Sequence, residues 1–293
     1  MQKLGFLRHP FHILTSSPWP FVTALQIFLF LFGFIFFMHD FLYSGFFCGL
    51  GFLLLIYSLY RWGSDVVYES TILGQHTNEI QTGLRFGVVL FIVSEIMFFF
   101  SFFWTFFYSS VSPAVQIGAI WPPIGIQTID AWSLPFLNTL LLLTSGVFAT
   151  LGHLISQNIG RGHADILTKV GGLVTPNYAS SKTVNFFFFL SLFCFVSSIV
   201  FGSIFTGVQV YEYLNSSFTI SDGAYGSIFY MATGFHGFHV LLGTCFLVIT
   251  AYRFYRGDFL GRYFLGLEGA VWYWHFVDVV WIFLFICIYW WGA

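Results

Sequence analysis

FGVVLFIVSEIMFFFSFFWTFFY, residues 86–108, decides the fold class of this chain. Apolar side chains fill nearly every position, so the stretch lacks both the one-sided pattern of a helix on a soluble core and the alternation of a membrane-barrel strand. A helix needs about 20 largely apolar residues to cross the hydrocarbon of a bilayer. The stretch is long enough, and its only charged residue is Glu95. It therefore predicts a transmembrane helix.

Six further runs have the same character, at 20–38, 41–60, 134–155, 184–210, 223–252 and 270–291. Of the 293 residues, 58% are hydrophobic and only 8% are charged. A soluble domain carries about 25% charged residues, so this chain could not cover a surface that faces water. We therefore expect an all-α, polytopic transmembrane bundle of seven helices that forms a single membrane domain over residues 1–293.

The basic residues predict how such a bundle is oriented. All ten lie in the N-terminal tail or in the second, fourth and sixth connections: Lys3, Arg8, Arg61, Arg85, Arg161, Lys169, Lys182, Arg253, Arg256 and Arg262. Seven helices that alternate in direction would place all of them on one side of the membrane. Basic connections stay on the cytoplasmic side, or on the matrix side in a mitochondrion. The N-terminus is therefore expected on that side and the C-terminus on the other.

Three polar stretches are expected to connect the helices. They cover residues 61–85, 109–133 and 156–183. The second contains Pro113, Pro122 and Pro123, which is typical of an ordered, turn-rich loop. The third is rich in glycine and basic residues, and we expect a flexible surface loop there.

Ionisable residues inside the runs are the first candidates for function, because a charge at the bilayer centre costs at least about 2.5–3.5 kcal/mol. Two acids fall within the runs, Glu95 and Asp278. Glu95 has no basic residue in its own run, so we expect it to be protonated. It would either handle protons or form a hydrogen bond to a neighbouring helix. Asp278 follows His275 by three residues and shares its helix face, so the two can pair.

His236 and His239 have the same three-residue spacing within the run 223–252. Two imidazoles so placed could contribute to a metal or haem site, or could hydrogen-bond to packed helices. A complete site needs further ligands, and His153 and four isolated cysteines form no recognisable ligand motif. We therefore expect no catalytic, cofactor or metal site on this chain. Glycines that should let the helices approach closely are Gly146, Gly202, Gly207, Gly234, Gly237 and Gly243.

Short motifs along the chain match one protein family in order and spacing. The first part contributes SPWP at 17–20, EST at 69–71, GLR at 83–85, SE at 94–95 and FFW at 102–104. The middle contributes WPPIGI at 121–126, PFLNT at 135–139 and FTISDG at 218–223. The last part contributes ATGFHGFH at 232–239, WYWHFVD at 272–278 and YWWG at 289–292. Through these motifs the chain resembles subunit III of the cytochrome c oxidases.

The resemblance implies a non-catalytic core subunit of a proton-pumping oxidase in the mitochondrial inner membrane. Its partners would be oxidase subunits I and II, other subunits of the complex and membrane phospholipids, and no nucleic acid. Haem a and copper would reside in subunits I and II, while this chain would support the active site of subunit I and guide oxygen toward it. The helices would split into a group of two and a group of five, with phospholipid in the cleft between them. Glu69, His76 and Arg253 would contact lipid headgroups, and Phe91 and Trp104 would face the acyl chains.

Two other classes of protein also have several apolar runs. A seven-helix receptor usually has an extracellular N-terminus, and a retinal protein needs a lysine within the membrane, whereas Lys3, Lys169 and Lys182 lie outside the runs. A secondary transporter normally has broken helices and polar residues that converge at the midplane. Glu95 alone gives little support to such a site, but these classes stay as the alternatives.

Overall fold

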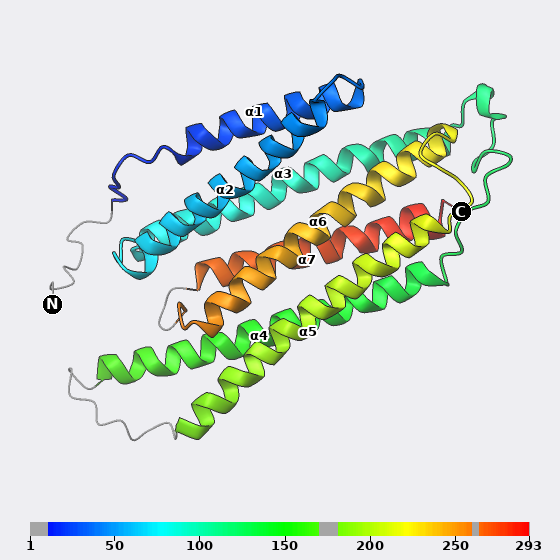
Figure 1. Cartoon of the computed structure of the whole chain (residues 1–293). Coiled ribbons are helices and arrows are strands. Elements are labelled where there is room, and N and C mark those ends of the chain that lie inside the picture. Colours follow the sequence, from blue (N-terminus) through cyan, green and yellow to red (C-terminus); the bar gives the residue numbers. More distant parts are fainter. Residues whose placement is uncertain (1–10, 170–180, 260–263, 293) are drawn as a thin grey trace. The chain divides into compact units, whose positions relative to one another are not determined.

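The computed structural model describes residues 11–169, 181–259 and 264–292. Over these residues it contains seven long helices and no strand (Figure 1). All seven are long and apolar enough to cross a membrane. The prediction of an all-α bundle with seven transmembrane helices is confirmed.

The chain divides into two compact units, Met1–Leu84 and Arg85–Ala293. The expected single domain, the grouping of the helices by two and five and the lipid between the groups stay predictions.

The first unit is built on a helical hairpin of α1 (Trp19–Met38) and α2 (Ser44–Thr71). Two glycines let the helices touch through their backbones. A Cβ on Gly33 would lie 2.8 Å from a backbone nitrogen of α2, and a Cβ on Gly51 would lie 2.9 Å from the backbone of α1. Small residues permit this close approach between membrane helices, so these glycines fix the line along which the hairpin packs.

A tryptophan ties the start of α1 to α2. The Trp19 indole nitrogen donates a hydrogen bond to Asp65 Oδ2 at 2.6 Å, and the Arg61 guanidinium lies 5.7 Å from the centre of the indole ring. Trp19 belongs to the SPWP motif, so the structure gives that motif a local role. Its ring anchors the entry of the chain into the hairpin.

The second unit begins at Arg85 within α3 and contains four further long helices. The Cα traces of α4 and α5 run side by side, and α6 lies beside α7 (Figure 1). The elements are α3 (Asn78–Val111), η1 (Val115–Ile117), α4 (Leu134–Lys169), α5 (Ser181–Leu214), α6 (Gly223–Tyr255), α7 (Leu265–Leu284) and the π-helical turn η2 (Phe285–Trp290).

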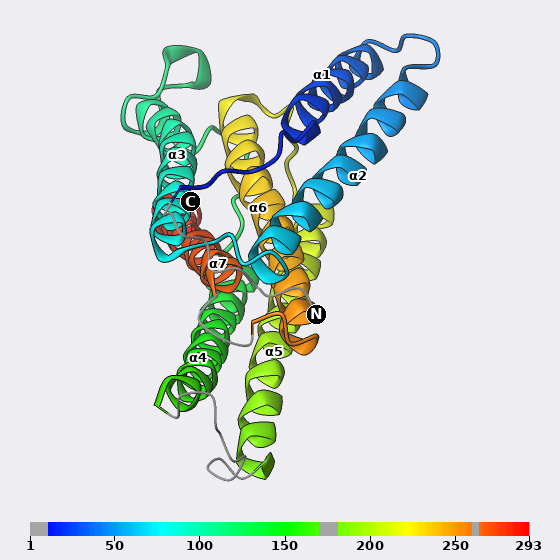
Figure 2. The ribbon, with the colours of Figure 1, turned by 90° about the vertical axis from the view of Figure 1, so that its left-hand side faces the viewer.

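Helix α7 is the most buried of the described helices. It packs against α4 and α6, and in Figure 2 it lies between α3 and α4 with α6 beside it. Its Trp274 and Trp281 are fully buried, as is Tyr289 in the η2 turn. The core of the second unit therefore forms around this helix, while the other helices present Phe and Leu side chains on their outer faces.

The helices extend beyond the apolar runs from which they were predicted. α2 ends at Thr71 rather than residue 60, and α3 begins at Asn78 rather than residue 86. A flexible loop was expected at 156–183, but α4 continues to Lys169 and α5 begins at Ser181. The prediction is therefore wrong over 156–169 and from Ser181. Residues 170–180 lie outside the described residues. Hydropathy marks where the hydrocarbon ends, but backbone hydrogen bonds can carry a helix into the polar region beyond it. Lys3, Arg8 and Arg262, which enter the orientation argument, also lie outside the described residues.

Candidate functional site

Glu95 on α3 is paired with a histidine of another helix. Its Oε2 lies 2.8 Å from Nε2 of His239 on α6. The other ring nitrogen of His239 is 2.7 Å from the Phe235 carbonyl, so Nδ1 must carry the hydrogen that it donates there. One further proton can then be shared between Nε2 and Glu95. Glu95 thus contacts a neighbouring helix, which was one of the two roles considered for it, while proton handling and the protonation of Glu95 stay predictions.

His236 and His239 share a helix but bind different partners. His236 is fully buried and donates from Nε2 to the Val277 carbonyl of α7 at 3.2 Å. Its ring also packs against Trp281, with ring centres 5.1 Å apart. The three-residue spacing therefore sends one imidazole toward α7 and the other toward α3. In this arrangement both histidines hold helices together.

His275 and Asp278 are in contact, as their spacing predicts. His275 Nδ1 lies 3.5 Å from Asp278 Oδ2, and its Nε2 lies 2.8 Å from the Thr150 hydroxyl of α4. Gly146 on α4 makes room for this pair, because a Cβ there would collide with the Asp278 carboxylate. The pair thus joins α7 to α4 through hydrogen bonds and close packing.

Two buried acids outside the predicted runs were missed. Glu268, near the start of α7, accepts a hydrogen bond from Arg85 of α3 at 2.7 Å. Glu212, near the end of α5, accepts one from the Tyr289 hydroxyl at 2.7 Å and a weaker one from Gln209 at 3.4 Å. Both lie just beyond the ends of the runs 184–210 and 270–291. The three-residue spacing of Gln209 and Glu212 is the signal that could have identified the second group.

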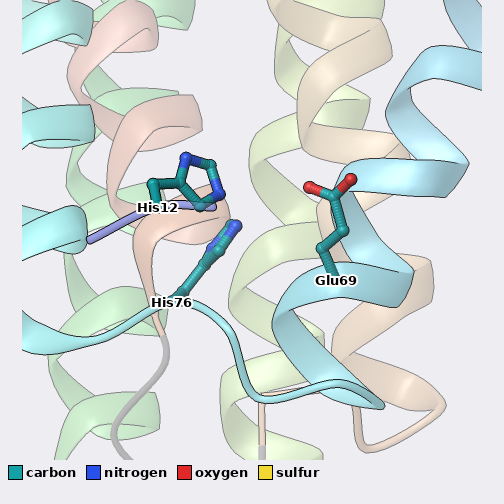
Figure 3. Close-up of side chains that lie close together, drawn as sticks. All are labelled: His12, Glu69 and His76. Atoms are coloured by element: carbon teal, nitrogen blue, oxygen red, sulfur yellow. The ribbon is translucent and has the colours of Figure 1, made fainter. Parts of the chain in front are cut away.

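In the first unit, three side chains that can bind metals converge. These are His12 from the segment before α1, Glu69 in the last turn of α2, and His76 in the connection to α3. One ligand atom from each lies within 4.8 Å of the other two (Figure 3). His76 is buried, and its burial, together with the nearby His12, lowers the pKa of its imidazole. Glu69 and His76 were predicted together as headgroup contacts, but no motif in the sequence connects them with His12.

The other predicted lipid contacts lie in the second unit. Arg253, in the last turn of α6, donates from Nε to Asp258 at 3.4 Å and lies 4.5 Å from the centre of the Phe259 ring. The guanidinium is thus held by the turn that follows α6. Phe91 and Trp104 of α3 are 48% and 66% exposed, so both present apolar surface on the outside of the unit.

Together, these features define a polytopic helical membrane protein whose buried polar side chains pair with one another between helices. Comparison with known proteins gives its family. Residues 9–175 and 189–293 match the family model for cytochrome c oxidase subunit III. The chain belongs to this family, and so to the subunits of an oxidase complex.

Relatives of nearly full length support the assignment. The cytochrome c oxidase subunit 3 of Pylaiella littoralis is 48% identical over 97% of this chain and 95% of its own length. The proteins of the same name from Marchantia polymorpha and Prototheca wickerhamii are 46% and 45% identical, over 98% of this chain and 98% and 99% of their own lengths. The receptor and transporter alternatives are therefore not favoured.

Proposed function

We propose that this chain supports the catalytic subunits of a mitochondrial, proton-pumping cytochrome c oxidase without carrying electrons itself. Haem a and copper would be held by subunits I and II, against which this chain packs in the inner membrane. Its N-terminus would face the matrix and its C-terminus the intermembrane space, as the distribution of Lys and Arg predicts.

One observation carries this proposal: three acidic side chains of the second unit bind partners on other helices. Glu95 pairs with His239, Glu212 with Tyr289 and Glu268 with Arg85. Buried polar groups are stable when they are paired, and such pairs fix the rotation of one helix against the next. They favour a rigid supporting body over a redox centre.

Phospholipid binding is the second part of the proposal. The exposed Phe91 and Trp104 would lie against acyl chains, and Glu69, His76 and Arg253 would contact headgroups. Asp258 engages one N–H group of Arg253, and a guanidinium has five, so the others can bind a phosphate. Bound lipid would also offer apolar oxygen a route toward the active site of subunit I.

The lipid role of Arg253 can be separated from its structural role in the intact oxidase complex. We expect Arg253→Ala to reduce the bound phospholipid seen by native mass spectrometry and to shorten activity during sustained turnover, while initial turnover stays near normal. Arg256→Ala is a matched control, because Arg256 leaves the same end of α6 but lies over Tyr252. Asp258→Asn removes the ion pair of Arg253 while keeping the Arg253 cation.

Retention of lipid in Asp258→Asn, together with its loss in Arg253→Ala, would support the anchor. If Asp258→Asn and Arg253→Ala behaved alike, Arg253 would instead serve the turn after α6. Cysteine labelling in sealed membranes tests the orientation: positions 112 and 130 should be accessible from the side opposite position 256. Labelling of all three from one side would contradict the proposed topology.

A further inference from the structure

His12, Glu69 and His76 form a three-residue cluster, of which the lipid proposal includes Glu69 and His76 but not His12. Figure 3 shows the rings of His12 and His76 turned toward each other, with Glu69 across from them on α2. The rings meet edge to face, with centres 5.6 Å apart. The structure records no hydrogen bond among the three side chains, although a ligand atom of each lies within 4.8 Å of the others.

A carboxylate and two imidazoles that face a common point can all bind one shared partner. Neutral imidazoles each offer a lone pair, and the carboxylate adds a negative charge. Within its own unit, Glu69 forms no ion pair with any described residue. A cation that accepts lone pairs satisfies all three groups.

We propose that His12, Glu69 and His76 bind a divalent transition-metal ion of the Zn²⁺ class. Two imidazoles and one carboxylate suit zinc better than Ca²⁺ or Mg²⁺, which prefer oxygen ligands alone. The ion would keep a fourth position for water or another oxygen ligand. The proposal is independent of the lipid role given above, although Glu69 and His76 enter both.

Only a small movement of the side chains is needed for all three to bind one ion. Zinc with ligands at about 2.0–2.2 Å in a tetrahedron holds its ligand atoms about 3.3 Å apart. The widest separation here is within 4.8 Å, so the ligand atoms must approach by about 1.5 Å at most. His12 is exposed and Glu69 is half-buried, so rotation of their side chains can provide this movement, while the buried His76 stays in place.

The ion would connect three different segments of the first unit. His12 lies in the segment before α1, Glu69 lies in the last turn of α2, and His76 lies in the connection between α2 and α3. One ion bound to all three would fasten the N-terminal segment to the far end of the helical hairpin. All three protein ligands would come from the first unit, so the ion would cross-link that unit.

The test uses the purified oxidase complex, stripped with a chelator and then titrated with Zn²⁺. Bound zinc is measured by elemental mass spectrometry after gel filtration, and Co²⁺ is used as a visible probe of tetrahedral coordination. We expect His12→Ala and Glu69→Gln each to bind one zinc fewer per complex than wild type, because each variant removes one of the three protein ligands. His39→Ala and Glu79→Gln remove the same kinds of side chain from the first unit outside the cluster, so they should match wild type.

His76 is buried, so replacing it would also disturb packing, and the test therefore rests on His12 and Glu69. Equal zinc content in wild type, His12→Ala and Glu69→Gln would overturn the proposal. An equal loss in the His39→Ala control would also overturn it. If Glu69→Gln lost phospholipid but kept its zinc, the metal site would be rejected while the headgroup proposal stood. Zinc loss with unchanged phospholipid would support the metal site and remove Glu69 from the lipid proposal.

Discussion

Gly202→Ala should destabilise the second unit because it places a methyl group too close to the ring of Trp274. The indole of Trp274 lies between Gly202 of α5 and Gly243 of α6. A Cβ at Gly202 would be 2.5 Å from Cη2 of the ring, and a Cβ at Gly243 would be 2.8 Å from Cε3. The ring cannot easily move away, because it is fully buried and its nitrogen donates to the Ser145 hydroxyl at 2.9 Å.

The size and sign of the effect follow from these contacts. Carbon atoms pack best at about 3.5–4.0 Å, so a methyl group at 2.5 Å forces a shift of about 1 Å in the ring or the helix. Overpacking of this kind costs about 1–3 kcal/mol. Gly207 lies on the same helix with no neighbouring atom within 4 Å of its Cβ position. Gly207→Ala should therefore stabilise α5 by about 0.5–1 kcal/mol, because it removes only the flexibility of glycine.

The assay is the temperature at which this subunit leaves the detergent-solubilised oxidase complex, followed on native gels. Gly202→Ala should lower that temperature, and Gly207→Ala should leave it equal or higher. The same contrast is expected on α6 between Gly243→Ala and Gly237→Ala, since a Cβ on Gly237 also meets no atom within 4 Å. If Gly202→Ala and Gly207→Ala changed the temperature by the same amount, the packing argument would be wrong.

Three further predictions concern the buried polar pairs, and the same heating assay tests them. Glu95→Gln keeps a hydrogen-bond donor for His239, so its stability and proton pumping should stay near wild type. Glu95→Leu leaves Nε2 of His239 unpaired and should lower the stability by about 1–3 kcal/mol. Equal effects of the two changes would contradict this. Arg85→Met should destabilise the subunit more than the double variant Arg85→Met with Glu268→Gln does. Only the single variant leaves the largely buried carboxylate of Glu268 without its arginine partner. Additive effects would show that the pair is not coupled. Glu212→Gln should be tolerated better than Glu212→Leu, because the amide oxygen can still accept the hydrogen bond from the buried tyrosine hydroxyl; similar losses in both would reject the role of that bond.

The number and approximate positions of the helices could be predicted from the sequence because the bilayer sets the length of an apolar run. Their ends could not, because a helix continues wherever its backbone hydrogen bonds are satisfied, whether or not the side chains are apolar. Glu69 shows the consequence: it was expected in a loop, yet it lies in the last turn of α2. Glu212 and Glu268 were overlooked for the same reason, since both lie on helices just past the ends of the apolar runs.

Contacts within one helix were predictable, and contacts between helices were not. The spacing of His275 and Asp278 places them on one face, so their contact follows from local geometry. The pairing of Glu95 with His239 joins residues 144 positions apart and depends on how α3 and α6 are rotated.

The glycines also show that contacts between helices could not be predicted from the sequence. Of the six glycines expected to mediate close approach, Gly146, Gly202 and Gly243 lie against neighbouring side chains. The other three, Gly207, Gly234 and Gly237, face open space. Composition alone does not separate these two groups, because the difference depends on which face of each helix meets another helix.

The central position of α7 has a consequence for how the protein is made. α7 follows α4, α5 and α6 in the chain, so those helices are inserted before the helix around which they pack. Until α7 emerges from the ribosome, Thr139 and Ser145 have no indole to bind, and Glu212 has no tyrosine partner. The earlier helices therefore lie in the bilayer as an incomplete assembly, in which these polar side chains lack their partners from the end of the chain. Biogenesis of this subunit thus passes through a stage at which insertion is well advanced but folding is not, and at that stage membrane chaperones and quality-control proteases have polar groups to recognise.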